Sequence, residues 1–415
     1  MIKRRRLLMQ FLALPISTCL LTMGWAADTT QPQPSSQNYT TESEQPTSAT
    51  TNAERNLIQL REMLIIYQNI ATQPWQSIPD DVRFRLGHKN SYVFILRDHL
   101  KKTSDLEFDS DTNIFDRDLL QAVKNFQQRL GLKVDGVIGK ATRAALNVPP
   151  DARVKQILVN MDRWEKLSHR LGHRYIMVNV PDYHLNLVEN DHIVLSMKII
   201  VGRPTRQTPE VISRITTIVF KPYWNVPAKL AENDIATKAM DDPDYLNKNN
   251  IHVYQDGDHG TEIDGHDVDW QSVAENGTDY HLRQDPGEKN SLGLVKFEFP
   301  NPYDVYLHDT PAKALFSEDT RDFSSGCVRL EKPFDLVAYL MKDDPNWNTD
   351  QMNSLLAEDK PTYVNVEHPL QVVITYLTAW IDENGKINFR DDVYGRDDPQ
   401  QNDDGSNQNN QPEAD

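Results

Sequence analysis

Two residues that can do covalent chemistry lie close together in the C-terminal half of the chain. They are His308 and Cys327, nineteen positions apart. The other cysteine of the sequence, Cys19, lies in an N-terminal segment with the layout of a removable signal, so Cys327 would be the sole thiol of the mature chain. One thiol can form neither an intrachain disulfide nor a cysteine-rich metal site. A free thiol in an exported protein therefore indicates a chemical role.

The residues around Cys327 favour a nucleophile. Gly326 removes a side chain next to the thiol, which lets a substrate carbonyl approach the backbone and leaves N–H groups free to hold a developing oxyanion. A neighbouring imidazole, that of His308, can take the thiol proton or hold a thiolate as an ion pair. Either arrangement makes the sulfur nucleophilic at neutral pH. The alternative is a buried cysteine that serves only as a small apolar side chain.

Composition limits the partners of the chain. It has 415 residues, of which 38% are hydrophobic and 25% charged, and a formal net charge of −17. This length predicts about two to three domains. An acidic chain lacks the basic face that phosphate neutralisation needs, so we expect no nucleic-acid partner. The histidines between residues 252 and 281 match no metal-ligand spacing, and we expect neither a metal nor a cofactor.

The N-terminus predicts export. A basic stretch, an apolar run and two small residues at the positions that a signal peptidase reads follow one another within residues 1–26. We interpret these residues as a signal peptide. The alternatives are an uncleaved inner-membrane anchor and lipidation at Cys19. Residues 27–52 are rich in Thr, Ser, Gln and Pro and contain few large apolar side chains, so they predict a disordered linker.

Residues 53–115 and 150–172 are predicted to form a helical scaffold, with a small module at 116–149 between them. Residues 91–100 fit either a helix or a buried strand. In the module, a stripe of apolar residues at helical spacing ends at Gly131, a residue typical of a C-cap. The run AVKNFQQRLGLKVDGVIGKATRAALN resembles the small helical peptidoglycan-binding module of cell-wall enzymes. The resemblance implies glycan binding, and the alternative is a packing module without a ligand.

From residue 173 the apolar period changes to the alternation of strands. Short strands separated by turns predict a sandwich or barrel-like sheet domain over residues 173–390. Within it, residues 228–292 are polar, and they rejoin the sheet just before His308. We predict a capping insertion there, and the alternative is a tolerated surface insertion. Residues 391–415 are acidic and predict a disordered tail.

The order His308, a spacer, then Ser324-Ser325-Gly326-Cys327 resembles the active-site signature of the L,D-transpeptidases, which have a YkuD-type catalytic domain. The order of parts over residues 53–395 resembles the large Gram-negative, YcbB-type branch. The fold class implied is multidomain α+β: a mainly-β catalytic domain with a capping insertion, a helical N-terminal scaffold and a small helical peptidoglycan-binding-like module. Many members have histidine where Ser325 stands and asparagine where Arg329 stands, so the roles of these two residues stay open.

The resemblance implies acyl transfer on peptidoglycan stem peptides in the periplasm of a Gram-negative bacterium. Cys327 would attack the carbonyl of the diamino acid at the third position of a tetrapeptide donor, and D-alanine would leave. The side-chain amine of another stem's diamino acid would open the thioester and form a cross-link. His308 would activate the thiol and shuttle the proton. The resemblance also implies that carbapenems acylate the thiol.

Further residues are candidates for oxyanion or substrate binding. They are Gly326, Ser325, Tyr306, Arg329, Ser324, Asp309, Trp224 and Asn225. The resemblance implies that backbone N–H groups near Cys327 and Gly326, with Tyr306, would hold the oxyanion, and that Arg329 would orient a substrate carboxylate or brace the loop. Asp309 would orient the imidazole, although alternation along a strand favours a backbone carbonyl in that role. Trp224 lies at the lid junction, where it would line the cleft or pack in the core.

Two other functions stay open on the sequence. The same acyl-enzyme with water as acceptor gives an L,D-carboxypeptidase or a hydrolase. A non-catalytic peptidoglycan-binding protein would instead use residues 116–149. Cys327 and His308 do not separate the transpeptidase from the carboxypeptidase, because the acceptor decides between them.

Overall fold

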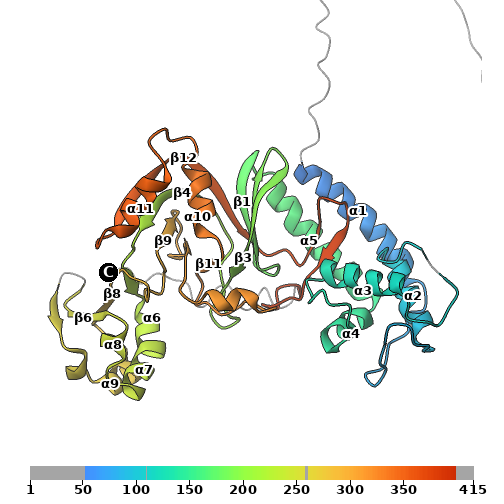
Figure 1. Cartoon of the computed structure of the whole chain (residues 1–415), viewed down its shortest axis with the longest axis horizontal. Coiled ribbons are helices and arrows are strands. Elements are labelled where there is room, and N and C mark those ends of the chain that lie inside the picture. Colours follow the sequence, from blue (N-terminus) through green and yellow to red (C-terminus); the bar gives the residue numbers. More distant parts are fainter. Residues whose placement is uncertain (1–51, 109, 258–259, 399–415) are drawn as a thin grey trace, which may run out of the picture. The chain divides into compact units, whose positions relative to one another are not determined.

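The computed structural model describes residues 52–108, 110–257 and 260–398 (Figure 1). The predicted signal peptide or anchor, Cys19, the linker before residue 52 and the tail beyond residue 398 lie outside the described residues. Over the three described ranges, no helix is both long and apolar enough to cross a membrane.

The N-terminal region is helical, as predicted. Its helices are α1 (Asn52–Ala71), α2 (Val93–Lys102), α3 (Arg117–Arg129), α4 (Lys140–Asn147) and α5 (Pro150–Ser168). The open choice at residues 91–100 resolves to a helix, α2. Helix α3 begins where the Asp116 carboxylate accepts a hydrogen bond from the N–H of Leu119 at 2.9 Å. It ends before Gly131, whose φ of +66° is the left-handed conformation expected of a glycine C-cap.

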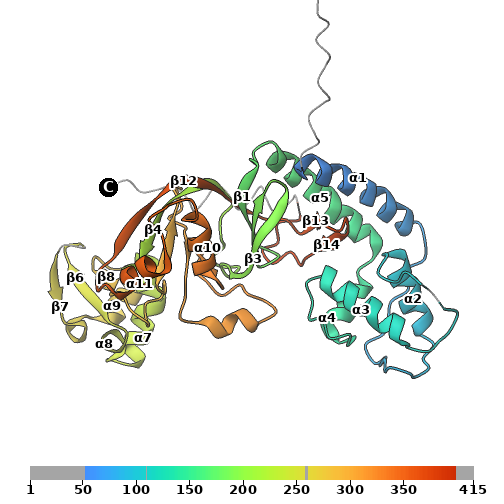
Figure 2. The same ribbon diagram turned by 45° about the horizontal axis from the view of Figure 1, so that its top comes forward.

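This region shares one hydrophobic core with a hairpin from the far end of the chain. The hairpin strands are β13 (Ala379–Ile381) and β14 (Ile387–Phe389). They pack with Leu119 and Phe126 of α3, and Figure 2 shows both strands beside α5. Arg129, which is buried, pairs with Asp105 at 2.6 Å and donates to the carbonyl of Ile387 at 3.1 Å. The helical region and the hairpin therefore form one packed body.

The catalytic-domain sheet is a closed barrel. Around the barrel the strands run β1, β12, β4, β9, β10, β11, β3, β2. Their bounds are β1 Arg174–Asn179, β2 His184–Glu189, β3 His192–Ile200, β4 Val211–Phe220, β9 Val295–Glu298, β10 Leu307–His308, β11 Val328–Leu330 and β12 Thr362–Thr375. Alternate side chains such as Ile176, Val178, Leu185 and Leu187 are fully buried inside it. Of the two architectures predicted, the structure adopts the barrel.

The barrel departs from the predicted elements in two places. We expect two strands at residues 364–366 and 371–380, but β12 is one long strand whose register shifts between Asn365 and Leu370. The irregularity accommodates Pro369, which cannot donate to the ladder. The apolar spacing over residues 333–342 predicts a helix, which the structure shows as α10 (Pro333–Leu340), whereas we expect none at α11 (Thr349–Ala357).

The predicted capping insertion is a folded unit, which we call the cap (residues 224–284). Its four-stranded sheet has the order β5, β8, β6, β7. The elements are β5 Trp224–Val226, α6 Ala228–Leu230, a π-helical turn Ala231–Ile235, α7 Ala236–Asp241, α8 Tyr245–Lys248, β6 Ile251–Gln255, β7 Thr261–Ile263, a 3₁₀ turn Gly265–Asp267, α9 Trp270–Asn276 and β8 His281–Gln284. The cap has a hydrophobic core of its own, which includes Ala236, Val253 and Leu282.

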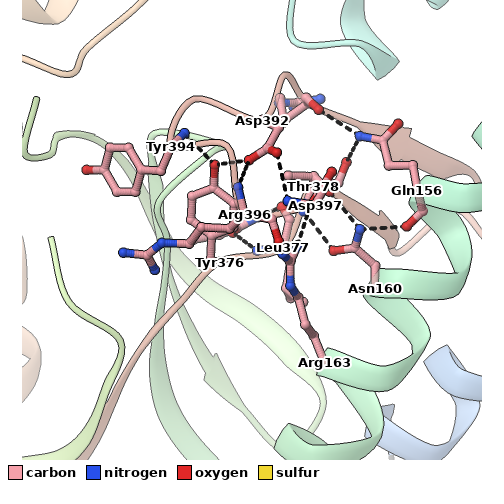
Figure 3. A network of polar contacts seen from close by, with 12 residues as sticks. Gln156, Asn160, Arg163, Tyr376, Leu377, Thr378, Asp392, Tyr394, Arg396 and Asp397 are labelled. Carbon is pink, nitrogen blue, oxygen red and sulfur yellow. Dashed lines mark hydrogen bonds and ion pairs between the residues drawn. The ribbon is translucent and has the colours of Figure 1, made fainter. Parts of the chain in front are cut away.

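The prediction of a disordered tail from residue 391 is wrong for residues 391–398. Figure 3 shows this segment in a polar network with α5 and the residues that follow β12. The Asp397 carboxylate pairs with Arg163 at 2.6 Å and accepts from the hydroxyl of Thr378 at 2.7 Å. The acidic composition of this segment predicts disorder. In the structure its acidic side chains instead form tertiary contacts with fixed partners.

Candidate active site

The pairing of β10 with β11 brings the two reactive residues to one face of the barrel wall. These strands are parallel, with Leu307 opposite Val328 and His308 opposite Arg329. Leu307 and Val328 are fully buried in the barrel core. Neighbouring residues along a strand point to opposite faces, so His308, Arg329 and Cys327 lie on the other face. The register of β10 with β11 thus brings His308 and Cys327 to the same face of the sheet.

His308 is buried, and a backbone carbonyl fixes its tautomer. Its Nδ1 lies 2.6 Å from the carbonyl oxygen of Asp309. A carbonyl only accepts, so Nδ1 carries the proton in the neutral ring and Nε2 holds the lone pair. Burial, with the nearby Arg329 guanidinium, lowers the pKa of His308 to about 3. The ring is therefore neutral at ordinary pH and can act as a base.

The side chain of Asp309 is turned away from the imidazole. Its carboxylate pairs with Lys313 and accepts from the N–H of Leu294 at 2.9 Å. Of the two arrangements considered for the imidazole, the structure shows the backbone carbonyl. The Asp309 carboxylate holds the loop before β9 in place. It packs so closely against Gly293 of this loop that a side chain at position 293 would clash with it.

Cys327 is partly exposed, and its Sγ lies 3.9 Å from the carbonyl oxygen of Asp304. Burial raises the pKa of the Cys327 thiol, while Tyr306 and the cationic Lys296 act in the opposite direction. Burial and the interaction with Cys327 raise the pKa of Tyr306 well above its usual range. The thiol and the imidazole are therefore both neutral at rest, a state that is compatible with general-base activation of the thiol and not with a preformed ion pair.

The loop Ser324–Cys327 is held by its own hydrogen bonds. The hydroxyl of Ser324 donates to the carbonyl of Cys327 at 2.6 Å and accepts from the N–H of Gly326 at 3.1 Å. The N–H of Gly326 is therefore occupied in this structure, contrary to its expected availability for an oxyanion. Among the described residues, the N–H of Cys327 has no acceptor. Gly326 has a φ of +121°, a conformation that side chains rarely adopt.

A groove with a volume of about 1090 Å³ opens at the thiol. Of the predicted site residues, Cys327, Ser325, Tyr306 and Asn225 line it. Trp224 instead packs against the core of the cap, in agreement with its alternative interpretation. The groove is thus formed by the barrel and the cap together.

Lys296 and Arg206 are site residues that our sequence reasoning missed. Lys296 lies on β9 directly opposite His308, its Nζ is 4.2 Å from the ring centre of Tyr306, and it pairs with Glu298 at 2.8 Å. Alternation along Val295–Glu298 would have pointed Lys296 outward, but no local signal pairs this strand with β10. Arg206 donates to the Ser325 hydroxyl at 3.1 Å.

Arg206 also joins the loop that contains Ser325 to the cap. Its guanidinium pairs with Asp234 in the π-helical turn of the cap. Both side chains are partly exposed, so the pair itself adds little stability. The pair matters for geometry, because one arginine contacts both the cap and Ser325, two positions before Cys327.

Arg329 has no anionic partner in the part of the chain that the structure describes, and its Nε is buried without a hydrogen bond. The charge of Arg203 is close enough, with burial, to lower the pKa of Arg329. Arg329, which is close to the thiol, and the neighbouring Arg203 have no carboxylate partner among the described residues, so an anionic group of a ligand would be stabilised beside them.

The described residues contain no group of three or more His, Cys, Asp or Glu side chains that could hold a metal ion. Two of the cap histidines have carboxylate partners: His252 lies 2.6 Å from Glu262 and 3.1 Å from Asp285, and His266 lies 2.8 Å from Asp264. His259 lies outside the described residues.

Comparison with known families matches both parts of the chain. Residues 173–347 match the L,D-transpeptidase catalytic domain, YkuD, and residues 91–146 match a putative peptidoglycan binding domain. Residues 173–347 are thus similar to the L,D-transpeptidase catalytic domain of the YkuD family, and they follow a helical region that contains the peptidoglycan-binding match. The second match begins at α2, earlier than the predicted module.

The chain is also similar to individual proteins of known name. The chain is 36% identical over 225 residues to a putative L,D-transpeptidase of Haemophilus influenzae, an alignment that covers 54% of this chain and 45% of that protein. It is 39% identical over 77 residues to a probable CtpA-like serine protease of Staphylococcus epidermidis, covering 18% of this chain and 16% of that one. The crystal structure of an L,D-transpeptidase from Stackebrandtia nassauensis aligns with 12% identity and a TM-score of 0.26, covering 71% of this chain and 97% of that one.

Proposed function

We propose that this protein is an exported L,D-transpeptidase that cross-links diamino acid residues of peptidoglycan stem peptides through a thioester on Cys327. The observation that carries the proposal is that Cys327, the residue just before β11, lies on the same face as His308 of the paired strand β10, beside the groove at the thiol. The periplasm of a Gram-negative bacterium and membership of the YcbB-type branch are parts of the same proposal.

In the acylation step, Nε2 of His308 takes the thiol proton as the sulfur of Cys327 bonds to the carbonyl carbon of the donor's third residue. The C–N bond to D-alanine then breaks, and the proton passes from His308 to the leaving amine. The neutral imidazole fits this sequence, because it can accept a proton and then donate it.

The oxyanion formed in this step requires donors that are fixed before reaction. The N–H of Cys327, which has no acceptor in the described chain, and the hydroxyl of Tyr306 are the candidates that the geometry supports. The Nζ of Lys296, over the ring of Tyr306, adds positive charge close to the same place.

In the second step, the amine of another stem attacks the thioester, the C–S bond breaks and Cys327 regains a proton. A diamino acid carries a carboxylate beside its reactive amine, and Arg329 with Arg203 would bind that carboxylate. An acceptor held in this way competes with water. The absence of a protein carboxylate on Arg329, among the residues described, supports this role.

Product analysis tests the proposal. Incubation with purified disaccharide-tetrapeptide should give cross-linked dimers and free D-alanine by mass spectrometry, and Cys327→Ala should give neither. Tripeptide without dimers would contradict cross-linking and assign the protein as an L,D-carboxypeptidase. Arg329→Lys keeps the charge but loses the planar fork, so we expect its product ratio to shift from dimer toward tripeptide.

We also propose that the helical module binds the glycan of peptidoglycan, the role that its family match supports. Deleting it is a poor test, because Leu119 and Phe126 belong to the core shared with the hairpin. Val137 is 62% exposed in the loop after α3, so Val137→Asp changes the surface alone. Reduced binding of Val137→Asp to isolated sacculi, with the same melting temperature, is the expected result. If Val137→Asp and wild type bind sacculi equally, the module has only a packing role.

A further inference from the structure

The turn between β3 and β4, residues 201–210, contacts the catalytic loop on one side and the C-terminal segment on the other. Thr208 is fully buried in this turn. Its hydroxyl donates to the carbonyl of Gly326 at 2.8 Å and accepts from the N–H of Gly202 at 2.8 Å. The side chain therefore uses both its donor and an acceptor site to tie the turn to the residue before the nucleophile.

The hydrogen bond from Thr208 to Gly326 fixes the orientation of a whole peptide group. The C=O of Gly326 and the N–H of Cys327 belong to the same planar peptide, so an anchored oxygen fixes the direction of the N–H. This N–H is the backbone donor at the nucleophile that has no acceptor among the described residues. The hydroxyl of Thr208 thus sets where the free N–H points.

The C-terminal segment holds Thr208 from the opposite side. The hydroxyl of Tyr394 donates to the carbonyl of Gly202 at 2.5 Å and accepts from the N–H of Thr208 at 3.2 Å. The ring of Tyr394 stacks on Tyr376, with ring centres 5.4 Å apart. Two hydrogen bonds from one phenol therefore close the turn around Thr208.

The segment that carries Tyr394 is itself anchored to the helical region, as Figure 3 shows. The hydroxyl of Tyr376 donates to Asp392 at 2.6 Å and accepts from the N–H of Tyr394 at 2.7 Å. Asp397 pairs with Arg163 of α5. An unbroken series of contacts thus runs from α5, through the C-terminal segment and the turn, to the peptide that precedes Cys327.

We propose that Thr208 and Tyr394 are positioning residues for acyl transfer, which aim the N–H of Cys327 at the oxyanion. The C-terminal segment 391–397 is then a working part of the active site. This inference rests on the proposed acylation of Cys327. It adds two residues, one of them more than sixty positions beyond the nucleophile, that do not touch the substrate.

Two reactions of the Cys327 thiol distinguish positioning of the oxyanion donor from a general effect on the structure of the site. Opening of a carbapenem by Cys327 passes through an oxyanion: the C–S bond forms, the ring C–N bond breaks and the nitrogen takes the proton. Alkylation by iodoacetamide forms a C–S bond with loss of iodide and needs no oxyanion donor. A misdirected N–H slows the first reaction and leaves the second unchanged.

The test compares Thr208→Val, Thr208→Ser and Tyr394→Phe in the full chain. We expect Thr208→Val to lower the carbapenem acylation rate about 10- to 100-fold and Tyr394→Phe about tenfold, the scale of a displaced oxyanion donor. Alkylation should stay within about twofold of wild type, and Thr208→Ser should restore acylation. If Thr208→Val does not fold, Tyr394→Phe, which keeps the ring stacked on Tyr376, gives the answer.

Tyr363→Phe is the matched control, because this tyrosine is 66% exposed on β12 and its hydroxyl has no hydrogen-bond partner among the described residues. Wild-type acylation by both Thr208→Val and Tyr394→Phe would overturn the inference. Equal losses of acylation and alkylation would also overturn it, since they mean a disturbed thiol. Labelling of Cys327→Ala would instead refute the proposed nucleophile, a separate failure.

Discussion

The helical region and the cap are both joined to the barrel, but by different kinds of contact. Apolar side chains of the helical region, such as Leu119, share a core with Val373 of β12 and with the C-terminal hairpin. The cap has a separate core, and the Arg206–Asp234 ion pair is a polar contact between it and the barrel. One region is packed into the barrel domain, whereas the other is a self-contained unit beside the groove.

This difference separates a fixed part of the molecule from a part that can open. Burial of a shared apolar core couples the unfolding of two regions, because neither can separate without exposing that surface. A unit with its own core keeps its stability when its outer contacts break. The groove at Cys327 is lined partly by this second kind of unit.

Matched leucine substitutions should produce the largest contrast between the two regions. Leu119→Ala and Leu282→Ala remove the same atoms from buried positions, 0% and 1% exposed. Each should cost about 2 to 5 kcal/mol. Calorimetry should show Leu119→Ala lowering the main transition, and Leu282→Ala producing an earlier, separate transition of the cap. A single shared transition in both variants would show that the cap is not an independent unit.

Acid should weaken the helical region through His99. This histidine of α2 is 1% exposed and stacks on Trp75 with ring centres 3.7 Å apart, and burial lowers its pKa to about 4. Between pH 6.5 and 4 the unfolded chain binds a proton that the folded ring does not, so stability falls as the pH falls. His308, with a pKa of about 3, acts in the same direction.

We therefore expect wild type to lose about 2 to 4 kcal/mol more than His99→Phe when urea unfolding is measured at pH 6.5 and at pH 4. Phenylalanine keeps an aromatic ring against Trp75 and cannot titrate. The contribution of His308 remains in both proteins and cancels in the comparison. Equal losses would place the acid sensitivity outside α2.

The smallest expected effect concerns the polar contact of the cap. Asp234→Asn breaks the pair with Arg206 and should cost less than about 1 kcal/mol, because both groups are partly exposed. Hydrogen–deuterium exchange in residues 228–290 should nevertheless become faster, with the main transition unchanged. Asp242→Asn, which breaks a pair with Lys248 inside the cap, is the control. Equal acceleration by both variants would remove the special role of Arg206.

Much of the barrel could be predicted because its strands carry local alternation. Strand β12 could not, since Pro369 interrupts the pattern while a register shift lets the strand continue. The polar composition of the cap indicates an insertion in the sheet domain. It does not indicate the hydrophobic core of the cap, because members such as Val253 and Leu282 are far apart in sequence. Residues 391–398 resembled a disordered tail because their partners are on α5 and after β12.

The same reasoning explains the candidate site. His308 and Cys327 could be predicted because their residue types and the glycine beside the thiol are local signals. Lys296 reaches the site through the register of β9 with β10, and Thr208 through a contact with Gly326 across more than one hundred positions. A single sequence gives no local sign of either. Ser324 was named as a candidate for binding, but its hydroxyl is used to shape the loop.

The central claim is that Cys327 forms the covalent acyl-enzyme, and intact-protein mass spectrometry after carbapenem treatment tests it most directly. Wild type should gain the mass of one carbapenem, on the peptide that contains Cys327. Cys327→Ala should gain none while keeping the wild-type melting temperature. A carbapenem adduct on Cys327→Ala, or an unmodified thiol in the wild-type protein, would contradict the account.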